Sequence, residues 1–425
     1  MQTSSHPPLP GRDASLGDLI QPDRVHGSLY TDPTLFDREL ERIWYRTWVY
    51  VGHECEVPPP NDFVVKALGT QPVIMSRDRS GHIHLLLNRC THRANLVCNT
   101  PRGKAGTFRC AYHGWTFSND GRLLGYPFQS GYGGAAAKED LALGRVPRIA
   151  SIHGFVFGSF AADGPTLTEH LGAATEVFDR LARLSPGGEV QVTAGWLQHT
   201  VRANWKMLVE NETDGYHPPF VHESIFGAAD SGIGDLYGDK SVALSRDLGS
   251  GHTECDLRPE FRRLNQPLGW FGTTPDRLPA YVASMREAYG AAAEEILVDG
   301  SPHVMIFPNL FIAEIQLFVI QPRAVDQTIQ HVTALQFKDA PELNRRMLHQ
   351  TQGSVGPAGF LLADDTEIYE RNQRGVQVRS PEWLLVSRGL HRERHDDNGR
   401  LVGHITDEGP IRAFWRHYHT LMEQP

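Results

Sequence analysis

Two short segments, each pairing one cysteine with one histidine, constrain the fold of this chain more than any other feature of its sequence. The first is Cys90-Thr91-His92 and the second is Cys110-Ala111-Tyr112-His113, so together they read C-x-H-x17-C-x2-H. These four side chains can share one metal centre only if both segments are loops that lie side by side. Such an arrangement predicts a small, rigid domain around them.

Two kinds of metal centre accept two cysteines and two histidines. Zinc binds such a set in tetrahedral geometry, but a zinc finger usually has its cysteines together and its histidines together. Here each segment carries one of each, which favours a [2Fe–2S] cluster with both cysteines on one iron and both histidines on the other. Neutral imidazoles raise the reduction potential, so this centre is predicted to relay electrons, with zinc as the alternative. The other cysteines, Cys55, Cys98 and Cys255, are expected to be free buried thiols.

A second concentration of metal-binding residues follows the tripeptide Asn204-Trp205-Lys206. Its histidines, His217 and His222, stand among several carboxylates, and two imidazoles with one carboxylate form an Fe(II) site with open positions for dioxygen. On a straight helix the two histidines would lie about 140° apart. Pro218 and Pro219 are therefore expected to kink the helix after His217 and bring both rings to one metal. The alternative is that two of the 21 histidines lie beside acids by chance.

Length and composition exclude several classes of protein. A chain of 425 residues has room for two or three domains. Its net charge of −9 and the lack of a Lys/Arg-rich run argue against nucleic-acid binding. No apolar run approaches the roughly 18 residues that cross a membrane, and residues 1–10 lack the features of a signal peptide. The odd number of cysteines, five, argues against a disulfide scaffold, so a cytoplasmic location is expected.

The hydrophobic pattern predicts an α+β chain that begins with a polar tail and a helix from Asp32, as its cap, to Trp44. Short apolar runs separated by turn residues then predict a small antiparallel β domain, with strands at 63–65, 72–75, 83–87 and 154–160. The predicted divisions are the tail and helix at 1–46, the β domain at 47–160 and a second domain at 161–425.

The second domain is predicted to contain an antiparallel sheet of four to seven strands, which come from runs at 304–307, 310–312, 316–320 and 328–337. A further strand at 191–201 leads into the segment with His217. Helices are expected at 279–297, 341–351, 360–374 and 410–422. The Gly- and Asp-rich region 224–250 is expected to be a loop over a pocket.

With both sets of ligands identified, the chain resembles the large (α) subunit of Rieske non-haem iron aromatic-ring-hydroxylating oxygenases, nearest to the benzoate-type dioxygenases. The resemblance extends from about Tyr30 to Tyr418. It depends on three motifs, C-x-H-R-x16-C-x2-H-G-W, N-W-K-x3-E-N-x2-D-x-Y-H-x4-H and G-P-A-G-F-x3-D-D. It implies a Rieske antiparallel β domain beside a catalytic domain, in which helices flank a large antiparallel sheet of the START-like helix-grip type.

The resemblance assigns metal ligands residue by residue. The [2Fe–2S] cluster is expected on Cys90, His92, Cys110 and His113. The mononuclear Fe(II) is expected on His217, His222 and Asp365, which has a glutamate five residues later (Glu370), as in relatives. Asp364 is the alternative third ligand.

Other matched positions are expected to support catalysis. Asp214 matches the aspartate that links a cluster histidine of the neighbouring subunit to an iron-ligand histidine, so that electrons cross between chains. A carboxylate between two imidazoles orients both rings. Asn211 and Tyr216 match positions around the iron, and Glu210 either serves the same purpose or caps a neighbouring amide.

The resemblance also implies partners and a reaction. A separate NADH-dependent reductase, with or without a ferredoxin, is expected to supply electrons, and O2 and an aromatic compound are the substrates. The chains are expected to form a homotrimer, with or without a small β subunit. The usual reaction is cis-dihydroxylation, although relatives also monohydroxylate or demethylate. The alternative from another class is a Rieske electron-transfer protein without oxygenase activity, but that would need only the β domain.

The substrate is expected to be an aromatic carboxylic acid, because residues 316–327 resemble the corresponding stretch of benzoate-type enzymes. Those relatives tend to have an arginine on this strand where this chain has Phe318. A buried carboxylate without a cation is costly. Either Arg323 or Arg246 therefore supplies the charge, or the substrate is a neutral or substituted arene. An apolar pocket and the ordinary core are equally good interpretations of Ile312, Phe360, Leu361 and Leu362.

Overall fold

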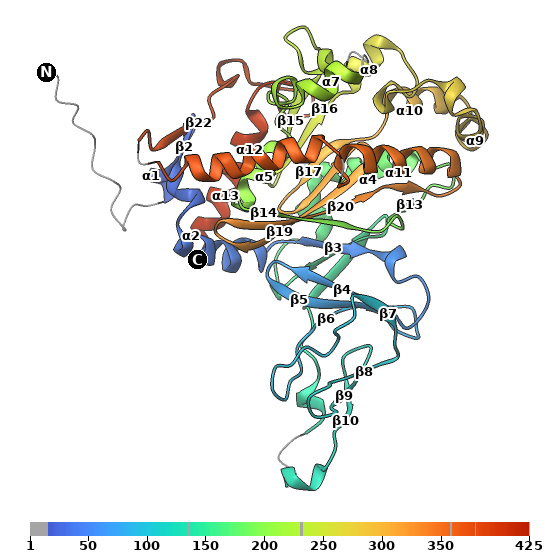
Figure 1. Ribbon diagram of the computed structural model, residues 1–425, viewed down its shortest axis with the longest axis vertical. Coiled ribbons are helices and arrows are strands. Elements are labelled where there is room, and N and C mark those ends of the chain that lie inside the picture. The colour runs from blue at the N-terminus through green and yellow to red at the C-terminus, as the bar shows by residue number, and fades with distance from the viewer. Residues whose placement is uncertain (1–15, 134–136, 230–232, 358, 379, 425) are drawn as a thin grey trace, which may run out of the picture.

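Antiparallel strands at two levels, one below the other along the longest axis of the molecule, form the framework of the fold (Figure 1). The structure is a computed structural model that describes residues 16–133, 137–229, 233–357, 359–378 and 380–424. Small sheets from the N-terminal part form the lower level, and one large sheet flanked by helices forms the upper level. The α+β class predicted from the sequence is confirmed.

Three small sheets form the lower level. The first, in the order β6-β5-β4-β7, contains β4 (Asp62–Leu68), β5 (Gln71–Arg77), β6 (Ile83–Leu87) and β7 (Arg102–Lys104). The second, β10-β9-β8, contains β8 (Thr107–Arg109), β9 (Thr116–Ser118) and β10 (Leu123–Gly125). The third, β11-β12-β3, contains β3 (Val49–His53), β11 (Arg148–Ile152) and β12 (Phe155–Ser159). Gly69, with a φ of 57°, provides the left-handed residue that the two-residue turn between β4 and β5 needs.

The upper level is a nine-stranded antiparallel sheet in the order β14-β20-β19-β18-β17-β16-β15-β24-β23. The central strands are β16 (His252–Asp256), β17 (His303–Ile306), β18 (Leu310–Ala313), β19 (Gln316–Ala324) and β20 (Gln327–Ala334). The outer strands are β14 (Leu197–Val201), β15 (Leu244–Gly249), β23 (Arg394–His395) and β24 (Leu401–His404). The predicted number of four to seven strands was too low.

The region 224–250 accounts for part of that error. It was predicted to be a loop, but it contains most of α7 (Glu223–Ala229) and all of β15. β15 pairs with β16 on one side and with β24 on the other. Pairing from both sides therefore stabilises a strand whose own sequence, with Asp247 and Gly249, has low β propensity.

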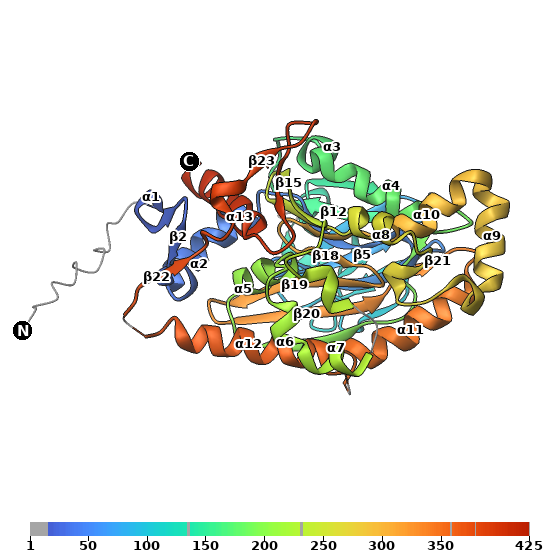
Figure 2. The ribbon, with the colours of Figure 1, turned by 90° about the horizontal axis from the view of Figure 1, so that it is seen from above.

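Helices lie on both sides of the nine-stranded sheet (Figure 2). The strands of this sheet divide their side chains between two cores. On β17, for example, Val304 and Ile306 enter one core and Met305 enters the other. The first core includes α4 (Thr175–Arg183), α8 (Arg258–Leu264), α9 (Pro279–Tyr289), α10 (Ala293–Asp299) and α11 (Pro341–Val355). The second includes α2 (Pro33–Glu39), α5 (Trp205–Glu212), α12 (Leu361–Gly375) and α13 (Gly409–Glu423).

Short elements complete the chain. A three-stranded sheet joins β1 (Ile20–Gln21), β2 (Arg24–His26) and β22 (Trp383–Leu385), and a two-stranded sheet joins β13 (Val190–Gln191) and β21 (Gln336–Phe337). The remaining α-helices are α1 (Leu16–Leu19), α3 (Leu167–Leu171) and α6 (Pro218–Val221). Among the described residues, no helix is both long and apolar enough to cross a membrane.

The N-terminal helix begins where the sequence predicted. The side chain of Asp32 accepts a hydrogen bond from the backbone N–H of Thr34 at 2.8 Å and thereby caps α2. The helix continues as a wider π-helical turn from Leu40 to Trp44. The predicted helix from Asp32 to Trp44 is confirmed.

A fully buried ion pair joins this helix to the upper level. Lys206 Nζ and Glu39 Oε1 are 2.5 Å apart, and both side chains are 0% exposed. Glu39 also accepts hydrogen bonds from Trp205 Nε1 at 2.7 Å and from the Tyr418 hydroxyl at 2.6 Å. Burial lowers the pKa of Lys206. One carboxylate therefore holds α2, α5 and α13 together.

We predict that Lys206→Met destabilises the protein by about 3–5 kcal/mol, because it leaves the Glu39 charge buried and unpaired. Urea unfolding followed by circular dichroism measures this effect. The matched control is Lys338→Met, which removes an exposed ion pair with Glu189 of the same 2.5 Å length and should cost about 0–1 kcal/mol. Equal unfolding midpoints for the two variants would contradict the prediction.

Candidate active site and metal centres

Helix α5 leads into the segment with the two histidines. Asn204 caps it, because its Oδ1 accepts a hydrogen bond from the backbone N–H of Lys206 at 3.1 Å. The helix ends at Glu212, and the chain then bends at residues 215–217. A Cβ at Gly215 would lie 2.3 Å from the backbone oxygen of Ile405, so the close approach of these two backbones requires glycine.

The predicted break in the helix exists, but its position was wrong. Helix α5 has already ended at Glu212, and Pro218 and Pro219 begin the new helix α6 directly after His217. Proline is favoured at the first positions of a helix, where its missing N–H is not needed. His222 ends α6, and the rings of His217 and His222 lie 5.4 Å apart between centroids.

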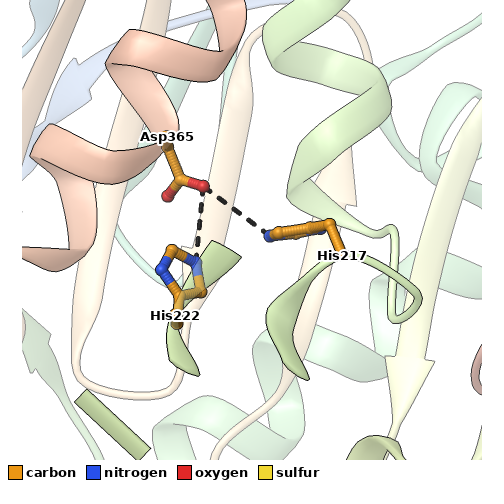
Figure 3. A group of neighbouring side chains, drawn as sticks. All are labelled: His217, His222 and Asp365. Atoms are coloured by element: carbon orange, nitrogen blue, oxygen red, sulfur yellow. Dashed lines mark ion pairs between the residues drawn. The ribbon is translucent and has the colours of Figure 1, made fainter. Parts of the chain in front are cut away.

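These two imidazoles meet one carboxylate from a distant part of the chain (Figure 3). Asp365 Oδ1, on α12, lies 3.7 Å from His217 Nε2 and 3.4 Å from His222 Nε2. One ligand atom from each of the three residues lies within 4.8 Å of the others. Asp365 Oδ1 is buried and has no hydrogen-bond partner among the described residues. Such an atom is costly unless a cation satisfies it, so these three residues (the triad) fit a metal ion.

Asp364, the alternative third ligand, lies on the other side of His222. Its Oδ2 is 3.9 Å from His222 Nδ1, and its side chain is 34% exposed. It therefore faces the nitrogen of His222 that points away from the triad. The geometry favours Asp365 as the third ligand.

Asp214 lies beside Nδ1 of His217, the other histidine of the triad. Its Oδ2 lies 3.4 Å from His217 Nδ1, so this imidazole has one carboxylate at each nitrogen. Its Oδ1 accepts a hydrogen bond from the backbone N–H of Tyr216 at 2.8 Å. Asp214 also lines a cavity of about 600 Å³ together with Glu210, Asn211 and His217. Another protein group could therefore approach this carboxylate.

Asn211 and Tyr216 differ in how they relate to the triad. Asn211 Oδ1 accepts a hydrogen bond from the Tyr369 hydroxyl at 2.7 Å, which ties α5 to α12. The ring of Tyr216 is 41% exposed and lies under the guanidinium of Arg388 at 3.9 Å. Tyr216 therefore supports Asp214 through its backbone, while its ring belongs to the surface.

Glu210 does not cap a neighbouring amide but connects three parts of the chain. Its Oε1 accepts hydrogen bonds from the Tyr30 hydroxyl and from Trp415 Nε1, both at 2.6 Å. Burial raises its pKa to about 7.

A second buried carboxyl, Glu212, was not singled out from the sequence. It is 7% exposed, and its Oε1 accepts a hydrogen bond from Gln330 Nε2 at 2.9 Å. Burial raises its pKa well above the usual range, and the carboxylate of Asp365 raises it further. The available signal was a second glutamate two residues after Glu210 within the ligand segment. Glu212 therefore adds a second buried carboxyl group near Asp365, where burial favours its uncharged form.

The two Cys/His segments form loops with the same backbone pattern. In the first, the N–H of Ala94 donates to the carbonyl of Cys90 at 3.0 Å, and in the second the N–H of Gly114 donates to the carbonyl of Cys110 at 3.0 Å. Ala94 and Gly114 both have positive φ, at 56° and 71°. These matching turns present the cysteine and histidine of each loop in equivalent positions.

The side chains of the two loops converge. Cys90 and Cys110 are buried, and the rings of His92 and His113 are 4.5 Å apart. His92 stacks on Trp115, and its Nδ1 is buried without a partner in the described part of the chain. This donor set fits a [2Fe–2S] cluster. Cys55, Cys98 and Cys255 are free thiols. Cys98 and Cys255 are buried, as predicted, whereas Cys55 is only half-buried.

Neither arginine proposed for a substrate carboxylate faces the triad. Arg246 is bound on both sides, by Asp256 at 2.8 Å and by Asp396 at 2.7 Å. Arg323 is exposed and lines a cavity between the two levels of the molecule. Phe318 is buried and packs on Phe311 at 5.4 Å between centroids.

The four apolar pocket candidates have different environments. Ile312 belongs to the core on the sheet face that α4 covers, and Leu362 belongs to the core that includes α5. Leu361 is half-buried, and Phe360 is 68% exposed. The core interpretation therefore applies to Ile312, and Phe360 is a surface residue in this chain.

We predict that Asp365→Ala loses the mononuclear iron, because it removes the oxygen shared by both imidazoles. Asp364→Ala is the matched control and should retain it. Iron and sulfide analysis separates the two centres: Asp365→Ala should keep its cluster, with the visible spectrum unchanged, and lose about one iron per chain. Loss of iron from Asp364→Ala instead would make Asp364 the ligand.

Comparison with known proteins agrees with this geometry. Residues 182–424 match the ring hydroxylating alpha subunit (catalytic domain) family, and residues 47–142 match the Rieske [2Fe-2S] domain. The chain is 29% identical to the 2-halobenzoate 1,2-dioxygenase large subunit of Burkholderia cepacia, over 91% of this chain and 86% of the relative. It is 30% identical to the anthranilate 1,2-dioxygenase large subunit of Acinetobacter baylyi, over 87% and 80%.

Solved structures give the same result. Naphthalene 1,2-dioxygenase from Rhodococcus sp., bound to indole, superposes with a TM-score of 0.82 at 26% identity and covers 95% of each chain. The predicted arrangement of a Rieske domain and a catalytic domain is thereby confirmed. This chain belongs to the large (α) subunits of the Rieske aromatic-ring-hydroxylating dioxygenases, oxidoreductases that contain a [2Fe–2S] cluster and a mononuclear non-haem iron.

Proposed function

We propose that this chain is the terminal oxygenase of a multicomponent system and hydroxylates a neutral aromatic ring. The observation that carries the proposal is the triad of His217, His222 and Asp365, whose ligand atoms face one point. Two imidazoles and one carboxylate leave coordination positions open, which a purely structural metal site would not. An electron carrier of Rieske type would not need this second centre.

In this proposal, the triad holds Fe(II) and the two Cys/His loops hold the cluster, through Cys90, His92, Cys110 and His113. When bound, the cluster supplies single electrons and the iron activates dioxygen. The chain's own residues prepare these centres. Asp214 Oδ2 lies 3.4 Å from His217 Nδ1, so its carboxylate favours the orientation in which Nε2 of His217 faces the metal. Burial of His222 and Asp365 limits the access of bulk water.

Electrons are proposed to cross between subunits. The cluster loops lie beside β8 and β9 at the lower end of the molecule, whereas α5 and α12 lie in the upper level (Figure 1). The cavity beside Asp214 is open to a partner, so a neighbouring cluster histidine could reach this carboxylate there. Head-to-tail contacts that close on themselves form a ring, and a homotrimer is the expected ring.

The remaining partners follow from the same proposal. A reductase that oxidises NADH is expected to load the cluster, with or without a ferredoxin, and a small β subunit completes the assembly if one is present. The free cysteines fit a reducing cytoplasm.

The substrate is proposed to be uncharged because neither arginine that was expected to bind a carboxylate faces the triad. Arg246 is already paired with two aspartates, and Arg323 lies behind the sheet. A buried carboxylate without a cation is unfavourable. The second candidate is an aromatic carboxylic acid, favoured by the likeness to relatives named for 2-halobenzoate and anthranilate.

Single-turnover chemistry tests this function. The reduced protein is mixed with 18O2 and with matched pairs of neutral and acidic arenes, such as toluene and benzoate, and the products are identified by mass spectrometry. We expect a doubly labelled cis-dihydrodiol from the neutral member of each pair. Product from the acids alone would reverse the substrate assignment, and no labelled product from any arene would contradict the oxygenase function.

We predict that Asp214→Asn keeps both metal centres and lowers coupled turnover by at least about 100-fold, because the amide no longer links two imidazoles by charge. The measurements are iron content, the visible spectrum of the cluster and the rate of product formation. Asp179→Asn, at an exposed aspartate that pairs with His153, is the control and should retain full turnover. Normal turnover of Asp214→Asn with both centres loaded would exclude the relay.

A further inference from the structure

A second cavity, outside the triad, lies where the two levels of the molecule meet. It has a volume of about 790 Å³, which is in the range that small ligands occupy. One wall comes from β4 and the start of β7, and the other comes from residues 192–198 and from β19 and β20 (Figure 1). We refer to it as the interdomain cavity.

The charged residues of the interdomain cavity leave positive charge unpaired. Its cations are Lys66, Arg102 and Arg323, and its anions are Glu56 and Asp62. Lys66 Nζ is 2.6 Å from Glu56 Oε1, so those two charges compensate each other. The side chains of Arg102 and Arg323 are exposed, and neither has a hydrogen bond or ion pair within the described ranges. Asp62 offsets one of these two charges, so the cavity has an excess of one positive charge, which favours an anion at the rim.

An aromatic wall lies next to these cations. The indole Nε1 of Trp196 donates to Glu56 Oε1 at 2.8 Å, and Lys66 Nζ lies 4.5 Å from the centre of the Trp196 ring. These contacts hold the ring in place. Val64 and Val319 add apolar surface to the same cavity. A flat apolar ligand would find a fixed surface here without much loss of side-chain entropy.

The sheet separates this cavity from the triad. Val319 and His331 are opposite each other on β19 and β20 and line the cavity. The adjacent residues Phe318 and Gln330 face the other way, and Gln330 donates to Glu212 at the end of α5. Successive residues of a strand point to opposite faces. A ligand in this cavity would therefore not contact the metal ligands.

We propose that the interdomain cavity is a binding site for an aromatic carboxylate, whose ring lies beside Trp196 and whose carboxylate is held by Arg102 and Arg323. Arginine binds carboxylates with two parallel hydrogen bonds, and an aromatic ring fills the apolar part of a cavity of this size. Because Arg102 belongs to the lower level and Arg323 to the upper level, the bound ligand links the two. The site is independent of the reaction at the triad.

The test uses 4-bromobenzoate and the full protein with both metal centres loaded. Diffraction at the bromine absorption edge on soaked crystals should place the bromine in the interdomain cavity. Equilibrium dialysis then compares the wild type with the double variant Arg102→Gln/Arg323→Gln. We expect the double variant to bind 4-bromobenzoate at least about 10-fold more weakly than the wild type, which is the factor for the loss of one charge-assisted hydrogen bond. Arg345→Gln, on the exposed face of α11, is the matched control and should bind like the wild type.

Three results would overturn the proposal. They are bromine found at the triad alone, no bromine bound to the protein, and equal affinity of the double variant and the wild type. The double variant should retain both metal centres and normal single-turnover product, because neither arginine contacts the triad. Product formation therefore tests the proposed oxygenase function, and binding of 4-bromobenzoate tests the interdomain cavity. One of these two proposals can be wrong while the other holds.

Discussion

The convergence of Asp365 Oδ1 with His217 Nε2 and His222 Nε2 is the constraint on which the rest of this structure depends. The carboxylate and the imidazoles are far apart in sequence, so helix α12 must pack on α5 in one register. Two contacts set that register: the Tyr369 hydroxyl donates to Asn211, and the backbone N–H of Asn204 donates to Gln373.

These contacts have a regular spacing. Asp365, Tyr369 and Gln373 are four residues apart on α12 and therefore lie along one face of the helix. All three are buried. The partners of Gln373 and Tyr369 are Asn204, the N-cap of α5, and Asn211, in the last turn of that helix. The face of α12 that carries the metal ligand Asp365 therefore also carries the two residues that attach this helix to α5, Tyr369 and Gln373. A shift of one residue would move the carboxylate away from both imidazoles.

Buried charge gives the same region its rigidity. Glu39 accepts hydrogen bonds from Lys206, Trp205 and Tyr418. Glu210 accepts hydrogen bonds from Tyr30 and Trp415. Buried ion pairs add little net stability, but a conformation that separates the partners leaves a buried charge unpaired and is strongly destabilised. These networks therefore act mainly by excluding alternative positions of α5.

Much of this architecture could be predicted from the sequence, because the strongest signals are local. Cysteine and histidine at fixed spacing predicted two loops, and the loops have matching turns. The motif around Asp364 and Asp365 limited the candidates for the third metal ligand to these two residues. Only Asp365 lies near the Nε2 atoms of both histidines. The errors concern long-range contacts: β15 is a strand because of its neighbours, and the helix break precedes His217 because Gly215 passes close to Ile405. Glu212 was missed because its significance depends on Gln330 and Asp365, which are distant in sequence.

A crystal structure with diffraction data recorded at the iron and zinc absorption edges would test both metal centres at once. We expect iron at two places: a pair of iron atoms among Cys90, His92, Cys110 and His113, and a single iron among His217, His222 and Asp365. Zinc at the Cys/His loops, or no iron at the triad of the loaded enzyme, would contradict this expectation.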